Sequence, residues 1–452
     1  MVVQKFGGTS VADPEAIQRL IHIVRTARSR DGRGPAVVVS AMSGVTDALL
    51  AIAAAAGAGR VDDALSRLEQ LRERHLAAAR SLAPAEANKG LGGQISAHFD
   101  DLAALARALG VLRELSPRTL DVVAAVGELL SSRIVTAALA EAEVPSEWVD
   151  ARRAIITNSD HTRALPLAAE TEAALRASVL AVIDAGRVPV LGGFVGSTVD
   201  GHTTTLGRGG SDYSGAIVGA GIGAREIQIW TDVDGMLTAD PRVISSPRLV
   251  PQLSFAEAAE LAYFGAKVLH PSTIVPAVER NIPVRILNSR KADGTGTMIT
   301  AEPPPSSMPL TALACKRDVT VVDITSSRML MAYGFLRRVF EVFERYTTAV
   351  DVVTTSEVTV SVTVDDRRHL EAIVESLSEF SQVSVDHEMA LLCAVGDRLR
   401  NEPAIAARAV GVLEEVPLRM ISQAASRRNI TVILRQSDLP HAMERLHEEF
   451  FG

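Results

Sequence analysis

The segment Lys5-Phe6-Gly7-Gly8-Thr9-Ser10 is the first place in the chain where residue types and spacing suit chemistry on an anion. An apolar stretch runs into two glycines, and Asp13 and Pro14 then begin a helical pattern. Glycines let backbone amides approach phosphate oxygens, a helix start favours negative charge, and Lys5 supplies a full positive charge. The hexapeptide equally suits an ordinary tight turn with a solvated lysine.

A second segment, Gly207-Arg208-Gly209-Gly210-Ser211-Asp212-Tyr213-Ser214, also suits anions. It lacks the Gly-Lys-Ser/Thr ending of a Walker A loop, so the common nucleotide-binding loop is not indicated. Arg208 can bind a carboxylate with two hydrogen bonds, the glycine amides can face phosphate, and Asp212 can orient a lysine or a magnesium shell. The alternative is a polar surface loop in which Ser211 or Asp212 caps the following helix.

Three further features are weak when taken singly. Glu128 follows Gly127 in a helical stretch rich in alanine and leucine, where a glutamate usually reaches solvent. Lys267, within Phe264-Gly265-Ala266-Lys267-Val268-Leu269-His270-Pro271, could be a surface lysine with a buried stem. Gly219-Ala220-Gly221-Ile222-Gly223 looks like a dinucleotide fingerprint, but it follows a helix and lacks a fitting acidic partner, so we expect close helix packing.

The elements that must position these residues follow an α/β pattern. Short apolar runs alternate with alanine-rich helical patterns, which indicates parallel strands with crossover helices. Helical spacing at 62–82 and 101–109 predicts a helical insertion between the early strands. The predicted strands are 36–40, 188–192, 226–231 and 283–287.

The proline-rich stretch after residue 302 is the clearest linker, because stacked prolines favour an extended chain. We therefore predict a catalytic domain over 1–302 and a linker over 303–315. Beyond it a β-α-β-β-α-β order occurs twice, which predicts ferredoxin-like domains over 316–388 and 389–452. The predicted strands are 319–324, 350–354, 358–364, one near Val383, 390–395, 418–422 and 430–434, and the helices are 334–346, 368–380, 403–413 and 439–450.

Composition excludes several classes of function. Hydrophobic residues make up 47% and charged residues 22% of the 452 residues, and the formal net charge is -8. No block of like charge points to nucleic acid or an anionic membrane. The apolar stretch at the start of the sequence is too short for a signal peptide, so we expect none, and we expect no apolar run long enough to span a bilayer. The two distant cysteines, Cys315 and Cys393, suit reduced thiols, so we expect a cytoplasmic protein.

Taken together, the motifs resemble the aspartate kinases of the amino-acid kinase family, in the family's order over essentially the whole chain. The resemblance implies an α/β amino-acid kinase fold, with a three-layer parallel-sheet core, followed by two ferredoxin-like ACT domains. It implies transfer of the γ-phosphoryl group of ATP, with Mg²⁺, to the β-carboxylate of L-aspartate, which gives 4-phospho-L-aspartate. The segments that carry it are 5–10, 207–214 and 264–271, described above, together with 40–47, 127–129, 230–235 and 240–242.

The resemblance also implies residue roles. Lys5 and Asp212 would act at the reacting centre, and no dedicated metal cage of protein groups is expected. Aspartate would be held by Ser40, Thr46, Glu128, Arg208 and Ser211, with Glu128 at the amino group and Arg208 at the α-carboxylate. ATP would be bound by Lys5, Gly7, Gly8, Thr231, Asp232, Leu237, Arg242, Lys267 and Val268. Leu237 stands where relatives often carry a tyrosine beside the nucleotide.

The C-terminal repeats look most like the lysine-sensitive, single-function branch, with a homodimer formed through the ACT domains. The implied effector residues are Met329, Ala332, Phe335, Leu336, Ala349, Val350, Asp351, Ser356 and Glu357. We expect Asp351 and Glu357 to be available to an ammonium group. Ala332 and Ala349 replace polar residues of relatives, so we expect weaker sensing of lysine or a different effector.

Two other functions stay open from the residues. The first is a kinase for glutamate or N-acetylglutamate, against which the complete Phe-Gly-Gly-Thr-Ser start and the paired ACT domains argue. The second is a non-catalytic amino-acid sensor. The joint presence of Lys5, Glu128, Arg208, Asp212 and Lys267 argues against that reading, because a sensor has no use for a full set of anion-handling groups.

Overall fold

The computed structural model describes residues 1–84, 89–265, 271–304, 308–326, 333–399, 401–423 and 427–452. It forms two compact units. The first comprises residues 1–236, 251–255 and 268–303, and the second comprises residues 237–250, 256–267 and 304–452. The domain boundaries predicted from the sequence stay predictions. Each unit is made of three separate segments, so the chain passes between the units more than once, whereas a single linker would join them only once.

An eight-stranded sheet forms the centre of the first unit, in the order β3-β5-β2-β1-β8-β10-β11-β9. From β3 to β10 in this order each strand is parallel to the next, whereas β10 and β11 are antiparallel. The parallel strands include the four predicted from the sequence. Every residue of β1, β2 and β5 is buried, as expected for strands covered on both faces. The bounds are β1 Val2–Phe6, β2 Ala36–Val39, β3 Ser146–Trp148, β5 Val188–Gly192, β8 Glu226–Thr231, β9 Gln252–Ser254, β10 Val284–Asn288 and β11 Thr297–Thr300.

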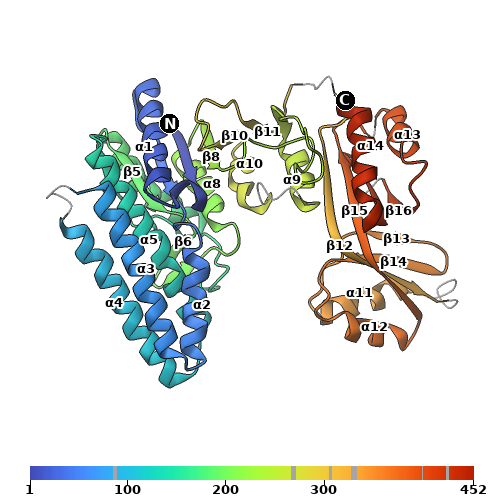
Figure 1. Ribbon diagram of the computed structural model, residues 1–452, viewed down its shortest axis with the longest axis horizontal. Coiled ribbons are helices and arrows are strands. Elements are labelled where there is room, and N and C mark those ends of the chain that lie inside the picture. Colours follow the sequence, from blue (N-terminus) through green and yellow to red (C-terminus); the bar gives the residue numbers. More distant parts are fainter. Residues whose placement is uncertain (85–88, 266–270, 305–307, 327–332, 400, 424–426) are drawn as a thin grey trace. The chain divides into compact units, whose positions relative to one another are not determined.

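Helices cover this sheet. Between β2 and β3 the chain inserts α2 (Val45–Gly57), α3 (Val61–Leu82), α4 (Lys89–Leu112) and α5 (Pro117–Glu141), which run side by side in Figure 1. This confirms the predicted helical insertion. The remaining helices are α1 (Pro14–Asp31), α6 (Ala168–Leu175), α7 (Ala181–Asp184), α8 (Gly210–Ile222) and α10 (Val275–Glu279), and a small sheet contains β4 (Ile156–Thr157), β6 (Val195–Thr198) and β7 (Thr203–Thr205).

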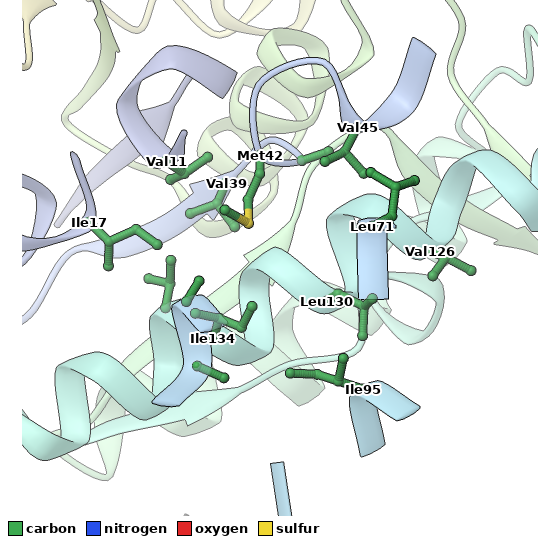
Figure 2. Close-up of a cluster of buried hydrophobic side chains, with 14 of the residues drawn as sticks. Val11, Ile17, Val39, Met42, Val45, Leu71, Ile95, Val126, Leu130 and Ile134 are labelled. Carbon is green, nitrogen blue, oxygen red and sulfur yellow. The ribbon is translucent and has the colours of Figure 1, made fainter. Parts of the chain in front are cut away.

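The main core lies between the sheet and the inserted helices. Figure 2 shows side chains from α1, β2, α2, α3, α4 and α5 meeting in one cluster, among them Val39, Leu130 and Ile134. Phe6 belongs to the same cluster. Because neighbouring residues of a strand point to opposite faces, Lys5 faces the other side, where a Cβ on Gly215 of α8 would lie 3.2 Å from Lys5 Cβ.

Helix α8 ends in the glycine-rich stretch that resembles a dinucleotide fingerprint. A Cβ on Gly219 would lie 2.6 Å from Ile227 atoms, and one on Gly221 would lie 2.4 Å from Leu175 Cδ1. The glycines therefore serve close packing of α8 against β8 and α6, as predicted.

Helix α5 corrects one expectation from the sequence. Its 25 residues are long and apolar enough to cross a membrane, although no such run was expected. However, 78% of its most apolar window is buried inside the fold, which is the behaviour of a core helix. Its apolar surface is used in packing against the sheet and the neighbouring helices.

A six-stranded sheet in the order β13-β14-β12-β15-β17-β16 organises the second unit. It confirms the β-α-β-β-α-β order from β12 to β15, whereas the second copy, from β15 to α14, ends at its second helix. Separate clusters of apolar residues lie under the two helix pairs, α11 with α12 and α13 with α14. The bounds are α9 Phe255–Tyr263, β12 Ala312–Thr325, α11 Phe335–Arg345, β13 Val353–Thr355, β14 Thr359–Val364, α12 Leu370–Ser378, β15 Gln382–Val395, α13 Pro403–Gly411, β16 Leu418–Ser422, β17 Asn429–Arg435 and α14 Leu439–Phe451.

Three details of this unit differ from the sequence-based expectations. Residues 312–315, placed in the linker, begin strand β12 and pair with β15. The predicted strand at 350–354 is confined to Val353–Thr355, because Asp351 and Val352 hydrogen-bond to Thr363 outside the regular ladder. The strand near Val383 and the strand at 390–395 are one 14-residue strand, β15, so the two repeats share a strand.

Candidate active site

The carboxyl ends of the central parallel strands meet at a cavity of about 960 Å³. Open α/β sheets bind ligands at this edge, because the turns that leave the strands point amides and side chains outward. Lys5 comes from β1, Ser40 follows β2, and Thr231 ends β8. The predicted residues that line the cavity are Lys5, Gly7, Gly8, Ser40, Thr46, Glu128, Arg208, Ser211, Asp212, Thr231 and Asp232.

Lys5 and Asp212 form an ion pair in this cavity. Lys5 Nζ lies 2.5 Å from Asp212 Oδ1, and the side chains are only 9% and 18% exposed. The pair joins the central strand β1 to the first turn of α8, two elements far apart in sequence. A shielded ammonium at this point can face a phosphoryl group while its counter-ion fixes its direction.

Two glycine turns line the cavity. Gly7 donates its N–H to the Trp230 carbonyl at 2.9 Å, and a Cβ on Gly8 would lie 3.3 Å from the Ala41 carbonyl oxygen. Gly209, with φ of 71°, turns the chain into α8 without a side-chain cap. The alternative in which Ser211 or Asp212 caps the helix is therefore wrong. The N–H groups of Gly210 and Asp212 instead donate to the carbonyls of Gly207 and Gly209, each at 3.0 Å, and the positive end of the α8 dipole lies at the cavity.

Glu128 is a deeply buried carboxyl of the cavity, with 3% of its surface exposed. Desolvation raises its pKa to about 8, while the Ala41 amide and the Lys5 charge act in the opposite direction. Within the part of the chain that the structure describes, Oε2 has no hydrogen-bond partner. Its burial corrects the view that a glutamate on this helix reaches solvent, and an unpartnered buried carboxyl oxygen suits a ligand that brings its own positive charge.

Arg208 is the cavity's exposed cation, and the described residues offer it no ion-pair partner. Its guanidinium is therefore available for an incoming carboxylate. Ser40 is held by its own N–H, which donates to Phe6 O at 3.0 Å, and by its carbonyl, which accepts from Ser131 Oγ at 2.7 Å. Ser211 packs against Gly193, where a Cβ would lie 2.8 Å from Ser211 Cα.

The structure places the predicted nucleotide-binding residues in different parts. Thr231 and Asp232 line the cavity. Leu237 and Arg242 belong to the second unit, where the Arg242 guanidinium donates to both oxygens of Asp240. Lys267 and Val268 lie outside the described residues. Among the residues that the structure describes, no group of three His, Cys, Asp or Glu side chains could hold a metal ion.

Sequence reasoning missed a second layer of the cavity wall, formed by Asp121, Thr162, Phe194 and Thr205. Asp121 lies seven residues before Glu128 on α5, and this spacing puts both on one face of the helix. The seven-residue spacing could have indicated that Asp121 lies beside Glu128. Phe194 and Thr162 have φ of 64° and 69°, and the sequence gives no indication of these left-handed conformations.

The predicted effector residues lie in the second unit. Asp351 is not free, since its carboxylate accepts from Lys316 Nζ and Tyr263 OH, each at 3.0 Å, and the expectation that it is available is wrong for this structure. Burial and the Asp351 charge raise the pKa of Tyr263 to about 12. Phe335 is buried and Val350 half-buried, whereas Leu336, Ala349, Ser356 and Glu357 are exposed. Met329 and Ala332 lie outside the described residues.

Comparison with known proteins agrees with this architecture. The amino acid kinase family model matches residues 1–288, and an ACT domain model matches residues 392–450. Aspartokinase 3, chloroplastic, of Arabidopsis thaliana is 37% identical over 99% of this chain and 81% of its own length. Lysine-sensitive aspartokinase 3 of Escherichia coli strain K12 is 35% identical over 100% of this chain and 99% of its own.

Solved structures give the same result. The E. coli aspartokinase III complex with lysine and aspartate (T-state) has a TM-score of 0.84 at 34% identity, and both chains are covered fully. The complex of that enzyme with aspartate and ADP (R-state) has a TM-score of 0.83 at 34% identity, also with full coverage. The parallel sheet with its anion-handling cavity thus defines an amino acid kinase. Within that class, the chain belongs to the aspartokinase family.

Proposed function

We propose that this chain transfers the γ-phosphoryl group of ATP to the β-carboxylate of L-aspartate and forms 4-phospho-L-aspartate. The observation that carries the proposal is the pairing, in one cavity, of a phosphate-handling group with an amino-acid-handling group. Lys5, Asp212 and the N-terminal end of α8 form the first, and Glu128 with Arg208 forms the second. The aspartate and ADP bound to the E. coli relative support the same pair of ligands.

The charge of each residue decides which part of the substrates it would bind. Glu128 would accept hydrogen bonds from the α-ammonium group, and Arg208 would bind the α-carboxylate, which leaves the β-carboxylate to face the phosphoryl group. That carboxylate is already a nucleophile, so no general base is required. Lys5 and the positive end of the α8 dipole would stabilise the charge that moves during transfer, and Asp212 would hold Lys5 in place.

Magnesium fits this site as a companion of the nucleotide. A bound Mg²⁺ would neutralise phosphate oxygens. The described residues offer isolated carboxylates such as Asp212 rather than a cage of ligands, and Mg²⁺ commonly binds through one or two carboxylates plus phosphate oxygens.

We also propose that the second unit regulates the kinase by binding an amino acid, with lysine as the first candidate. The name of the E. coli relative and the lysine in its complex support this effector. We further propose a homodimer through the ACT domains, a cytoplasmic location, and a role in supplying lysine, threonine and methionine.

A substrate panel tests the proposed activity. ADP release is followed with ATP, Mg²⁺ and either L-aspartate, L-glutamate or N-acetyl-L-glutamate. We expect turnover with L-aspartate to exceed that with the other two by at least about a hundredfold, because one added methylene displaces the reacting carboxylate and acetylation removes the ammonium that Glu128 needs. Preferential turnover of either alternative would overturn the assignment.

A further inference from the structure

The buried carboxylate of Asp121 has no role in the proposed chemistry, although it lines the same cavity as Glu128. Its side chain lies in α5 and the residue is 1% exposed. A carboxylate this deeply buried requires partners, and Asp121 has three. Thr205 Oγ1 donates to Oδ1 at 2.5 Å, the Thr162 N–H donates to both oxygens at 3.0 and 3.1 Å, and His161 Nδ1 lies 2.6 Å from Oδ2.

These partners occupy both oxygens of Asp121. Each oxygen already takes part in two contacts with the protein, so little capacity is left for a substrate group. Asp121 is therefore unsuited to act as a base or to bind the α-ammonium. Its contacts instead run to two chain segments, the end of strand β7 and the loop 158–165.

Both segments support the turn that carries Arg208. Thr205 precedes Arg208 by three residues, and its carbonyl accepts from the Ala164 N–H at 2.9 Å, so strand end and loop are also joined to each other. Gly207, with φ of 77°, lies against the loop, because a Cβ there would be 3.2 Å from the Thr162 carbonyl oxygen. A shift of the loop would therefore move the start of the arginine turn.

The backbone conformation of Thr162 indicates that neighbouring groups hold the loop in place. Its φ of 69° is a left-handed conformation that a β-branched residue adopts rarely and at a cost in free energy. Such a conformation persists where surrounding groups hold it, and here the Thr162 N–H is held by both oxygens of Asp121. Phe194, which among the described residues is the other non-glycine of the cavity wall with a left-handed backbone, also contacts the turn, since its carbonyl accepts from the Leu206 N–H at 2.9 Å.

We propose that Asp121, through His161, Thr162 and Thr205, is a positioning residue that sets the place of Arg208 and thereby the affinity for the α-carboxylate of the acceptor. This inference rests on the proposed function. It predicts that damage to the network weakens aspartate binding and leaves nucleotide binding intact, because the network touches the arginine turn and not Lys5 or the Gly7–Gly8 turn.

Two neighbouring threonines on β7 provide a matched test. Thr205 and Thr204 are both buried, and each makes one side-chain hydrogen bond, Thr205 to Asp121 and Thr204 to Thr157 at 2.7 Å. Kinetic constants are measured for Thr205→Val, Thr204→Val and Asp121→Asn in the full-length protein. We expect the KM for aspartate to rise about threefold in Thr205→Val and about tenfold in Asp121→Asn, with the KM for ATP unchanged and Thr204→Val like the wild type.

A double-mutant cycle separates positioning from general loss of stability. In an Arg208→Ala background, Asp121→Asn should add less than about twofold to the KM for aspartate, because the group that it positions is gone. Equal effects of Asp121→Asn in both backgrounds would overturn the inference, as would an unchanged aspartate KM in Thr205→Val. If Asp121→Asn fails to fold, the comparison of Thr205→Val with Thr204→Val still tests whether the network affects the KM for aspartate. A wild type that phosphorylates no aspartate overturns the proposed function itself, and this inference with it.

Discussion

Lys5 Nζ and Asp212 Oδ1 are 2.5 Å apart, although the two residues come from the first strand and from a helix more than two hundred positions later. Asp212 takes its position from Gly209, whose left-handed backbone begins α8 at this point. The pair is largely shielded from water, so its direction is fixed before a phosphoryl group arrives. Preorganised charge of this kind stabilises a transition state without reorganisation during the reaction.

Replacing either member of this pair should impair turnover more than binding. For Lys5→Ala and Asp212→Ala we expect kcat to fall about a hundredfold or more, with smaller changes in both KM values. The matched control is Arg67→Ala, which breaks an exposed ion pair with Asp63 and should leave kcat unchanged. Steady-state kinetics at saturating substrates are the measurement. Near-normal kcat in a Lys5 or Asp212 variant would assign that residue to structure.

Removing a charged contact to the amino acid should raise the KM for aspartate selectively. Arg208→Ala and Glu128→Ala each remove a charge-assisted contact, which should cost roughly 1.5 to 3 kcal/mol, or tenfold and more in KM. The KM for ATP should change little. Initial rates over a grid of both substrates give the two constants, and an aspartate KM that stays constant would remove the residue from the acceptor site.

The raised pKa of Glu128 predicts a pH dependence of aspartate binding. With a pKa of about 8 the carboxyl is largely protonated in the free protein at pH 7. The ammonium of aspartate favours the ionised form, so the KM for aspartate should fall as the pH rises from 6.5 toward about 8.5. Glu128→Gln should bind aspartate weakly and lose this trend. A wild-type KM independent of pH across this range would show that Glu128 is not the group that meets the ammonium.

His75 predicts a pH-dependent stability that is independent of catalysis. It is fully buried in α3, Nδ1 lies 2.7 Å from the Leu71 carbonyl oxygen, and burial lowers its pKa below the ordinary 6.5. As the pH falls below about 6.5 the unfolded chain binds a proton that native His75 resists, so stability decreases. Thermal melts between pH 7.5 and 5.5 should show a smaller loss of Tm for His75→Leu than for the wild type. Exposed His441→Leu is the control, and equal losses in all three proteins would refute the account.

Lys316 predicts how the second unit responds to lysine. Its ammonium lies 3.0 Å from Asp351 and 2.7 Å from Asp365, so an added lysine must compete with a tethered one for the Asp351 carboxylate. In Lys316→Met, lysine should inhibit at about tenfold lower concentration, since one competing contact to a charged group is gone. Lys291→Met, which alters an exposed pair with Asp234, is the control. The same inhibition constant in Lys316→Met and the wild type would remove Asp351 from the effector site.

Much of the catalytic unit could be predicted from the sequence because the patterns that indicate its strands and turns lie within short stretches of the chain. Strands such as β2 and β5 are short apolar runs. Lys5 lies just before a glycine-rich turn and Arg208 lies within one, and such turns allow close approach to an anion. The burial of Glu128 could not be predicted, since it depends on Gly192, where a Cβ would lie 2.9 Å from the Glu128 carbonyl oxygen. That contact joins residues of α5 and β5 that only the fold brings together.

The second unit was harder to predict, for two physical reasons. In β15 an exposed, alternating first half precedes a fully buried second half, so one strand looks like two separate segments. The hydrogen bonds from Lys316 and Tyr263 to the Asp351 carboxylate join three segments that are distant in sequence, and no sequence pattern predicts such contacts. Resemblance to relatives indicated which residues face the effector, but it could not indicate that one of them already has a partner.

Trapping of the product tests the central claim most directly. The protein is incubated with ATP, Mg²⁺, L-aspartate and hydroxylamine, which converts an acyl phosphate into a hydroxamate at the carboxyl group that was phosphorylated. We predict the β-hydroxamate of aspartate, formed in proportion to ADP and lost in Lys5→Ala. Formation of the α-hydroxamate, or ADP release without any aspartyl hydroxamate, would contradict the assignment of Arg208 to the α-carboxylate and of the β-carboxylate to the phosphoryl group.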